Sequence, residues 1–295
     1  MEYITLQNGV KIPQLGYGVY QIGRDQCEEC VSVALKVGYR HIDTAQSYFN
    51  EEEVGRAIAA SGIDRRDIFL TTKVWIEHYG YEETKESVRV SMEKLKTDYL
   101  DLVLLHQPFS DVYGAWRALE ELYEAGKLRA IGVSNFAPDR LVDICSFSRI
   151  RPMINQVETH PYHQQAEAHR WMEKYGVCHE AWAPFGEGRE GLFSDPVLVG
   201  IGQKYGKTSA QVMLRWAIQR GIVVIPKSVH TERMKENFAV FDFALSAEDM
   251  QAIAALDKER SAFFSHIDPK MVEWFAQMVE ERKHQQDHTK EKKNW

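Results

Sequence analysis

Short apolar runs and longer amphipathic stretches alternate along most of the chain. In the longer stretches apolar residues recur every three or four positions, as on one face of a helix. The clearest of these predicted helices cover residues 26–37, 82–94, 115–125 and 210–219. The short runs predict eight strands, at residues 15–18, 39–43, 68–73, 100–106, 128–134, 153–158, 177–182 and 222–226. Eight strand–helix units averaging about 30 residues favour an α/β fold with a single closed (β/α)8 TIM barrel over a doubly wound sheet.

The two ends of the chain add elements to this barrel. Residues 4–10 and 11–18 predict an N-terminal β-hairpin around Asn8-Gly9, a strong two-residue turn signal, and the hairpin could close one end of the barrel. Asp268-Pro269 is typical of a helix start. The positions after it predict an apolar stripe that docks on the barrel: Met271, Val272, Trp274, Phe275, Met278 and Val279. Because no linker-like segment interrupts the chain, we predict one domain with its C-terminal helical extension at residues 1–283, and a flexible polar tail at residues 284–295.

Composition argues against several classes of partner. The net charge is −7 and the basic residues are scattered, which argues against nucleic acid. No apolar run approaches the ~18 residues of a membrane span, and the first residues carry no signal-peptide pattern, so we expect a cytoplasmic protein without membrane contact. Four cysteines in 295 residues do not form a disulfide framework, and no set of residues has metal-ligand spacing. We expect no metal, and a monomer with a homodimer as the alternative.

Four titratable side chains lie where predicted strands end. Asp43, Lys73 and His106 end three successive strands, and Tyr48 lies in the loop just after Asp43. Because the active sites of such barrels lie at the carboxyl ends of the strands, we expect the four groups to meet on one rim. Each of them alone also fits an ordinary structural role, such as a helix cap, a solvated lysine, a packed loop tyrosine or a core histidine.

Together the four side chains predict acid catalysis on a carbonyl group. A phenol with a pKa near ~10 is a weak acid at neutral pH unless a nearby cation favours its anion. Lys73 can supply that cation, Asp43 can keep Lys73 charged and oriented, and His106 can hydrogen-bond the oxygen on which negative charge develops during reduction. Tyr48 is then the proton donor.

The sequence strongly resembles the aldo-keto reductase family over residues 5–256. The resemblance rests on separated segments in the correct order: Gly38-Tyr-Arg-His-Ile-Asp-Thr-Ala45 with Tyr48, Thr72-Lys-Val-Trp75, Leu104-Leu-His106, Gly132-Val-Ser-Asn-Phe136, Asn155-Gln-Val-Glu158 and Pro226-Lys-Ser228. It implies a (β/α)8 barrel and hydride transfer from NADPH to an aldehyde or ketone, with Tyr48 delivering the proton. The short connection from Gln107 to Gly114 is similar to that of bacterial 2,5-diketo-gluconate reductase-like members.

The resemblance also implies contacts with cofactor and substrate. Ser134, Asn135 and Gln156 correspond to groups that hydrogen-bond the nicotinamide carboxamide, and Trp182 corresponds to an aromatic residue, more often Tyr, that stacks on the nicotinamide ring. The segment after the eighth strand corresponds to the site of the 2′-phosphate that distinguishes NADPH from NADH, followed by adenine contacts. Its matching residues are Lys227, Ser228, Arg233, Glu236 and Asn237. The matching substrate-pocket residues are Tyr20, Trp75 and Phe109.

Two departures from the family pattern bear on the pocket. Ala183 stands where a serine is more common, so it supplies no hydroxyl near the cofactor. Gln107 stands where many members carry Trp, which removes an aromatic wall and predicts a more polar or more open substrate site. We expect a small aldehyde, α-dicarbonyl or keto-sugar as the substrate. Two alternatives stay open: a nucleotide-binding interaction module without turnover, and a barrel in which Lys73 is a Schiff-base nucleophile.

Overall fold

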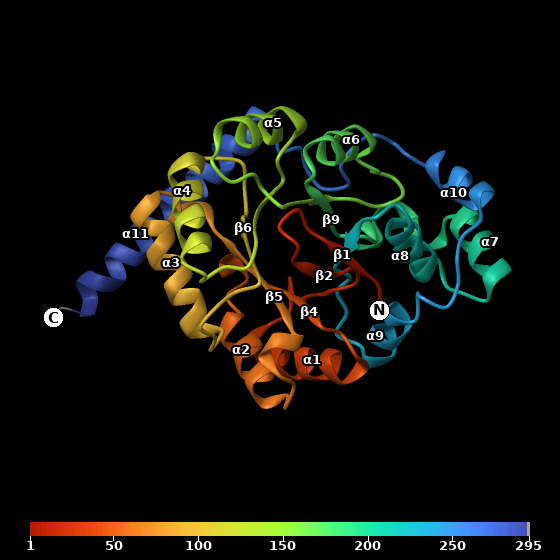
Figure 1. Cartoon of the computed structure of the whole chain (residues 1–295), viewed down its shortest axis with the longest axis horizontal. Coiled ribbons are helices and arrows are strands. Elements are labelled where there is room, and N and C mark those ends of the chain that lie inside the picture. The colour runs from red at the N-terminus through yellow and green to blue at the C-terminus, as the bar shows by residue number, and fades with distance from the viewer. Residues whose placement is uncertain (294–295) are drawn as a thin grey trace.

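Eight parallel strands form one curled sheet with helices around it (Figure 1). The computed structural model describes the backbone of residues 1–293 and the side chains of residues 1–282. In spatial as in chain order, the strands are β3 (Tyr17–Gly18), β4 (His41–Asp43), β5 (Phe69–Val74), β6 (Leu102–Leu105), β7 (Ile131–Ser134), β8 (Ile154–Glu158), β9 (Cys178–Trp182) and β10 (Val223–Val224). The sheet closes on itself, because the Gly16 amide donates to the Val224 carbonyl at 2.8 Å and the Val224 amide donates to the Gln14 carbonyl at 2.9 Å. The predicted barrel is confirmed.

The barrel helices include the four that were predicted, with boundaries shifted by a few residues at most. They are α1 (Arg24–Val37), α2 (Glu51–Ala60), α3 (Tyr81–Lys94), α4 (Val112–Glu124), α5 (Pro138–Phe147), α6 (Ala166–Tyr175), α7 (Pro196–Tyr205), α8 (Ser209–Gln219), α9 (Thr231–Phe238) and α10 (Ala247–Ala254). Short 3-10 helices lie between them: η1 (Gln46–Tyr48), η2 (Arg65–Asp67), η3 (Ile76–His78) and η4 (Gly186–Ser194), the last of which is interrupted by a kink at residues 187–191. Strand β5 buries all six of its residues, because one face fills the barrel and the other meets the helices. This two-sided burial is why the strands do not alternate strictly between apolar and polar residues.

The predicted hairpin lies at the amino-terminal end of the barrel strands. It consists of β1 (Tyr3–Thr5) paired antiparallel with β2 (Lys11–Pro13). The side-chain amide of Asn8 donates to the Arg129 carbonyl at 2.8 Å, and that of Gln7 donates to the Pro152 carbonyl at 2.9 Å. Both carbonyls lie just before barrel strands begin. The hairpin therefore closes the end of the barrel opposite the strand ends that carry the predicted chemistry.

The C-terminal helix α11 (Pro269–Lys293) begins at the predicted proline and runs along one side of the ring of helices (Figure 1). Its predicted apolar stripe is only partly buried. Phe275 is 4% exposed, whereas Val272 and Trp274 are 39% and 51% exposed. The tail predicted at residues 284–295 lies outside the residues whose side chains are described, so its flexibility stays a prediction.

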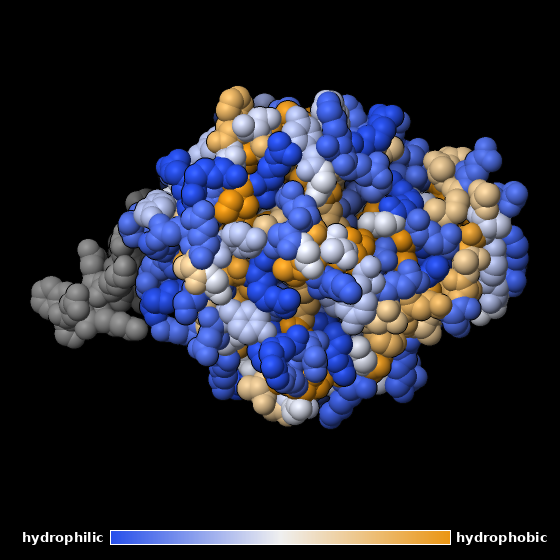
Figure 2. All heavy atoms as spheres, in the orientation of Figure 1, coloured by the Kyte–Doolittle hydropathy of each residue, from blue (hydrophilic) through white to orange (hydrophobic). Residues whose placement is uncertain are grey.

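Polar side chains cover most of the face shown in Figure 2, and apolar residues are scattered among them. Among the described residues, no helix is both long enough and apolar enough to cross a bilayer. All four cysteines are free thiols, as the composition indicated.

Candidate active site

The four titratable side chains singled out at strand ends lie together at the carboxyl end of the barrel. Asp43 is the last residue of β4, and Tyr48 ends η1. Lys73 lies near the end of β5, and His106 follows β6 directly. The Lys73 ammonium donates to Asp43 Oδ1 at 2.5 Å and to the Tyr48 hydroxyl at 3.4 Å. The rings of Tyr48 and His106 meet edge to face with their centres 5.7 Å apart. The parallel pairing of β4, β5 and β6 has thus brought the four groups to one rim.

Burial and charge act in opposite directions on this chain of groups. Burial works to lower the pKa of Lys73, but Asp43 and Tyr48 outweigh it, and the pKa is raised above its ordinary value. Lys73 is therefore a cation. Burial raises the pKa of Tyr48 to about 12, although Lys73 acts to lower it. The expected effect of Lys73 is present, but burial is stronger, so Tyr48 keeps its proton at neutral pH.

His106 is a neutral imidazole. Burial, followed by the charges of Lys73 and His266, holds the pKa of His106 well below its ordinary value. Its Nδ1 atom lies 3.4 Å from the hydroxyl oxygen of Ser47. A neutral imidazole has one N–H, which can donate to a carbonyl oxygen without placing a second positive charge beside Lys73.

The residues expected around the nicotinamide are linked to the acid–base chain by hydrogen bonds. Gln156 Nε2 donates to Asp43 Oδ2 at 2.9 Å, and the Ser134 hydroxyl donates to the Gln156 carbonyl at 2.8 Å. Asn135 has a left-handed backbone with φ 65°, and its Oδ1 accepts from Trp182 Nε1 at 2.8 Å. These bonds set the orientation of all three polar residues and of the indole. Their contacts with a cofactor stay a prediction.

The segment after β10 places its predicted residues in two environments. Lys227 and Arg233 are exposed and line the same cavity as the tyrosine and the histidine. Ser228 is buried, and its hydroxyl accepts from the His230 amide at 3.0 Å, so it shapes the turn before α9. Two residues of α9 lie outside the described lining of the cavity: Glu236 and Asn237.

A cavity of about 840 Å³ opens at this rim. The ring of Tyr20 lies 5.0 Å from that of Tyr48, and the ring of Trp75 lies 5.1 Å from that of His106. Both Tyr20 and Trp75 line the cavity. Gln107 lines the cavity, and the lining residues from the barrel that were not singled out in the sequence include Ser47, Phe185, Arg189 and Phe193.

One side of the cavity is formed by residues 257–282, which we call the C-terminal wall. Phe275 lies 6.0 Å from Trp75 and 5.4 Å from Phe109, measured between ring centres. Phe109, expected in the pocket, lies behind Phe275 and does not belong to the described lining. The other lining residues of this wall are Phe263, Phe264, His266, Trp274, Met278 and Arg282. These aromatic rings line the same cavity as Gln107, and the more polar or more open substrate site expected from Gln107 stays a prediction. The apolar stripe of α11 was the sequence feature that indicated this wall, but we had interpreted it only as a surface that docks on the barrel and not as part of the cavity.

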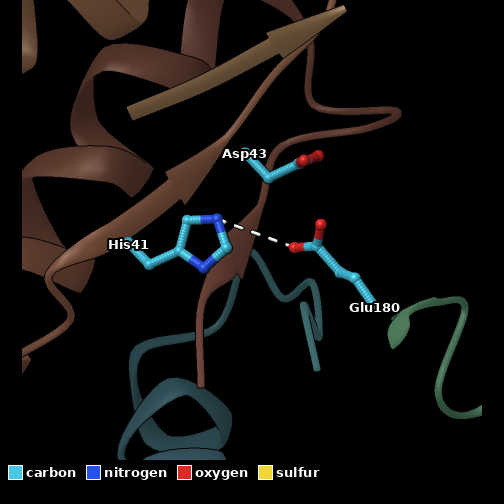
Figure 3. Close-up of side chains that lie close together, drawn as sticks. All are labelled: His41, Asp43 and Glu180. Carbon is cyan, nitrogen blue, oxygen red and sulfur yellow. Dashed lines mark ion pairs between the residues drawn. The ribbon is translucent and has the colours of Figure 1, made fainter. Parts of the chain in front are cut away.

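A second polar cluster lies in the barrel core beside the Lys73–Asp43 pair. In Figure 3, His41 and Asp43 come from the same strand and face Glu180. His41 Nε2 lies 3.7 Å from Glu180 Oε1, and one possible ligand atom from each of the three residues lies within 4.8 Å of the others. This spacing could suit a metal ion. However, both Asp43 oxygens accept hydrogen bonds, from Lys73 and from Gln156, so the local positive charge is already the Lys73 ammonium.

The charge of this cluster depends on the protonation states of Glu180 and His41. Burial, aided by the charge of Asp43, raises the pKa of Glu180 to about 8, and burial lowers the pKa of His41 to about 3. Both side chains are therefore neutral at pH 7, and Asp43 is left as the counter-ion of Lys73. Neither His41 nor Glu180 was among the predicted site residues, because each lies within a predicted strand and not at its end.

Known proteins share both this sequence pattern and this architecture. The Aldo/keto reductase family profile matches residues 14–258. The chain belongs to this family. Glyoxal reductase of Bacillus subtilis (strain 168) is 47% identical over 258 residues, which cover 87% of this chain and 93% of the relative. An aldo/keto reductase of Brucella melitensis is similar in structure with a TM-score of 0.84 at 48% identity, over 87% of this chain and 99% of that one. An aldo-keto reductase of Bombyx mori, solved in complex with NADP, gives a TM-score of 0.85 at 33% identity, over 89% of this chain and 95% of that one.

Membership confirms the resemblance drawn from the sequence motifs. As an aldo/keto reductase, this chain is an oxidoreductase of carbonyl compounds that uses a nicotinamide cofactor. The family match ends at residue 258, whereas α11 begins at Pro269. Most of the C-terminal wall therefore lies beyond the part of the chain that defines the family.

Proposed function

We propose that this aldo/keto reductase reduces small aldehydes, α-dicarbonyls or keto-sugars to alcohols with NADPH, and that Tyr48 donates the proton. The observation that supports this most is the pair of contacts made by one buried ammonium. Lys73 bonds both Asp43 and the Tyr48 hydroxyl. Because Tyr48 and His106 both line the cavity, a carbonyl oxygen can lie against the phenol and the imidazole together.

The electrostatics favour donation of a proton over its abstraction. With a pKa of about 12 the phenol is protonated at neutral pH, and the alkoxide formed by reduction is a stronger base than a phenolate. Transfer from Tyr48 to that oxygen is therefore downhill. Lys73, 3.4 Å from the phenol oxygen, stabilises the phenolate that remains, and neutral His106 hydrogen-bonds the same substrate oxygen. We infer that Tyr48 enters the reductive half of the reaction as the protonated phenol at neutral pH.

The cavity has the groups that a phosphorylated nicotinamide dinucleotide needs. Trp182 offers an aromatic face for the ring, and Lys227 and Arg233 line the same cavity as exposed cations. The fork of an arginine matches phosphate oxygens, which favours NADPH over NADH. When bound, NADPH supplies the hydride. The NADP complex of the Bombyx mori relative supports this choice.

The two alternative functions fit these contacts less well. A Schiff-base lysine must first lose its proton, but the pKa of Lys73 is raised and its ammonium is bonded to Asp43. A binding module without turnover needs no buried acid–base chain beside its cavity. The similarity to a glyoxal reductase also favours turnover.

Loss of NADPH absorbance with glyoxal, other aldehydes and keto-sugars tests the proposal. Tyr48→Phe should lower kcat by about 10²–10⁴ and retain NADPH binding, because it removes only the hydroxyl group that supplies the proton. Arg233→Ala should instead weaken NADPH binding by about tenfold or more and leave NADH binding unchanged. Lys235→Ala is the matched control, since Lys235 is also an exposed cation of α9 but lies outside the described cavity lining. Tight NADPH binding by wild-type protein without turnover of any carbonyl would contradict the proposal.

A further inference from the structure

Arg282 is a cation that α11 places at the substrate end of the cavity. It lines the cavity, and it lies beyond the family match that ends at residue 258. Its guanidinium carbon lies 5.6 Å from the centre of the Trp75 ring and 5.5 Å from that of Phe49. The same Trp75 ring meets His106 at 5.1 Å. A single indole therefore separates this positive charge from the groups that would hold the carbonyl.

The hydrogen-bonding capacity of Arg282 is not used up by its protein neighbours. Nη1 lies 3.9 Å from Glu77 Oε2, which is too long for a hydrogen bond. Within the part of the chain whose side chains are described, neither of these two buried atoms has a hydrogen-bond partner. Glu77 also lies 3.3 Å from His78, but burial lowers the pKa of His78, so Glu77 remains the acid nearest to Arg282. With 29% of its side chain exposed, Arg282 can still be reached by a ligand.

The surroundings of Arg282 strengthen its attraction for an anion. The rings of Trp75 and Phe49 lie next to it, Phe275 packs against Trp75, and His106 is neutral. The nearest catalytic carboxylate, Asp43, is already paired with Lys73. A guanidinium that is partly withdrawn from water against aromatic rings binds a carboxylate more strongly than a fully solvated one does.

We infer that Arg282 is a specificity-determining residue that binds the carboxylate of an oxo acid whose carbonyl lies at Tyr48 and His106. Because the Trp75 indole lies between Arg282 and His106, the carboxylate and the carbonyl of one substrate must be separated by several bonds. The substrate class is therefore semialdehyde acids and keto-sugar acids in preference to 2-oxo acids. This inference rests on the proposed carbonyl reduction and narrows its substrate class.

A matched pair of aldehydes isolates the contribution of the charge. 4-Oxobutanoate and methyl 4-oxobutanoate present the same aldehyde with and without a carboxylate. For wild-type protein we expect kcat/KM to be at least about tenfold higher for the acid. Arg282→Gln should bring the acid-to-ester ratio close to one by raising KM for the acid, and Arg282→Lys should restore part of it.

Two further variants test whether the acid preference rises when the competing carboxylate is removed and whether it responds to an unrelated surface charge. Glu77→Gln removes the competing carboxylate and should raise the acid-to-ester ratio. Lys270→Gln removes an exposed charge from the same helix and should leave the ratio unchanged. The acid preference should also fall with added salt, because Arg282 is partly exposed.

The possible results separate this inference from the proposed function. A wild-type ratio close to one, or a KM for the acid that is unchanged by Arg282→Gln, overturns the assignment of Arg282. Carbonyl reduction itself still stands in that case if glyoxal or the ester is reduced. If wild-type protein with NADPH reduces none of these carbonyls, the proposed function fails, and the inference fails with it.

Discussion

The two sides of the cavity are built in different ways. On the barrel side, the side chains of Asp43 and Lys73 are 2% and 0% exposed and are joined by a direct hydrogen bond between neighbouring strands. On the C-terminal wall, Trp274 is 51% exposed and Arg282 has no hydrogen bond to its nearest acid. A change on the barrel side disturbs the core, whereas an exposed residue of the wall such as Trp274 can change without disturbing it. The comparison indicates that the chemistry resides in the barrel and the selectivity in the wall.

Glu158 on β8 joins the two sides. Its Oε2 accepts from the Ser261 hydroxyl at 2.5 Å, and its Oε1 accepts from the Ala262 amide at 2.8 Å. Burial works to raise the pKa of Glu158, but its hydrogen bonds outweigh burial and the pKa is lowered. The next residue, Phe263, packs 5.3 Å from Trp182, measured between ring centres. A buried carboxylate thus positions the start of the wall against the indole expected to stack on the nicotinamide.

Lys73→Met is expected to have the largest effect on the barrel side of the cavity. It removes the cation beside Tyr48 and leaves Asp43 buried without its partner. We expect kcat to fall by about 10²–10⁴ and the free energy of unfolding to fall by about 3–5 kcal/mol, measured by steady-state kinetics and urea unfolding. Lys85→Met removes a surface ion pair with Glu121 and should change neither quantity appreciably. Full activity of Lys73→Met would show that the barrel side does not need its cation.

Glu180→Gln tests whether the core beneath the site holds a neutral acid. Because the folded-state pKa of Glu180 is raised from 4.5 to about 8, the folded protein keeps a proton that the unfolded chain releases within this window. The free energy of unfolding of the wild type therefore falls as pH rises from about 4.5 to 8, by up to about 1.4 kcal/mol per pH unit.

The Gln side chain carries no such proton, so Glu180→Gln should become progressively more stable than the wild type from pH 5 to pH 8 in urea titrations. Glu232→Gln, at an exposed position of α9, should follow the wild-type curve. Parallel curves for wild type and Glu180→Gln would mean that Glu180 is ionised in the folded protein.

Glu158→Gln has the smallest expected effect. It tests the C-terminal wall without changing the barrel side of the cavity. It weakens the hydrogen bonds to residues 261 and 262 without touching the acid–base chain. We expect KM for the carbonyl substrate to rise about threefold with kcat nearly unchanged, because the loss concerns the positioning of the wall. A large fall in kcat at constant KM would show that the wall contributes to the chemistry as well.

The barrel side was predictable because its information is local. Three successive predicted strands end close to a residue that carries chemistry, and parallel strands place their carboxyl ends on one rim. The C-terminal wall was less predictable, because an apolar stripe such as that of Phe275 and Met278 does not state which surface it covers. Glu180 escaped notice for a related reason, since it lies in the middle of β9 and the sequence does not state which strand interior faces the rim.

The sequence by itself determined the order of strands and helices, the hairpin, the start of α11 and the four groups at the rim. These follow from periodicity, turn chemistry and strand ends, which act over a few residues. Only the tertiary structure decided that burial outweighs Lys73 at Tyr48, that Phe275 covers Phe109, and that Arg282 lies behind Trp75. Such outcomes depend on desolvation and on contacts between segments far apart in the chain, and neither is encoded at any single position.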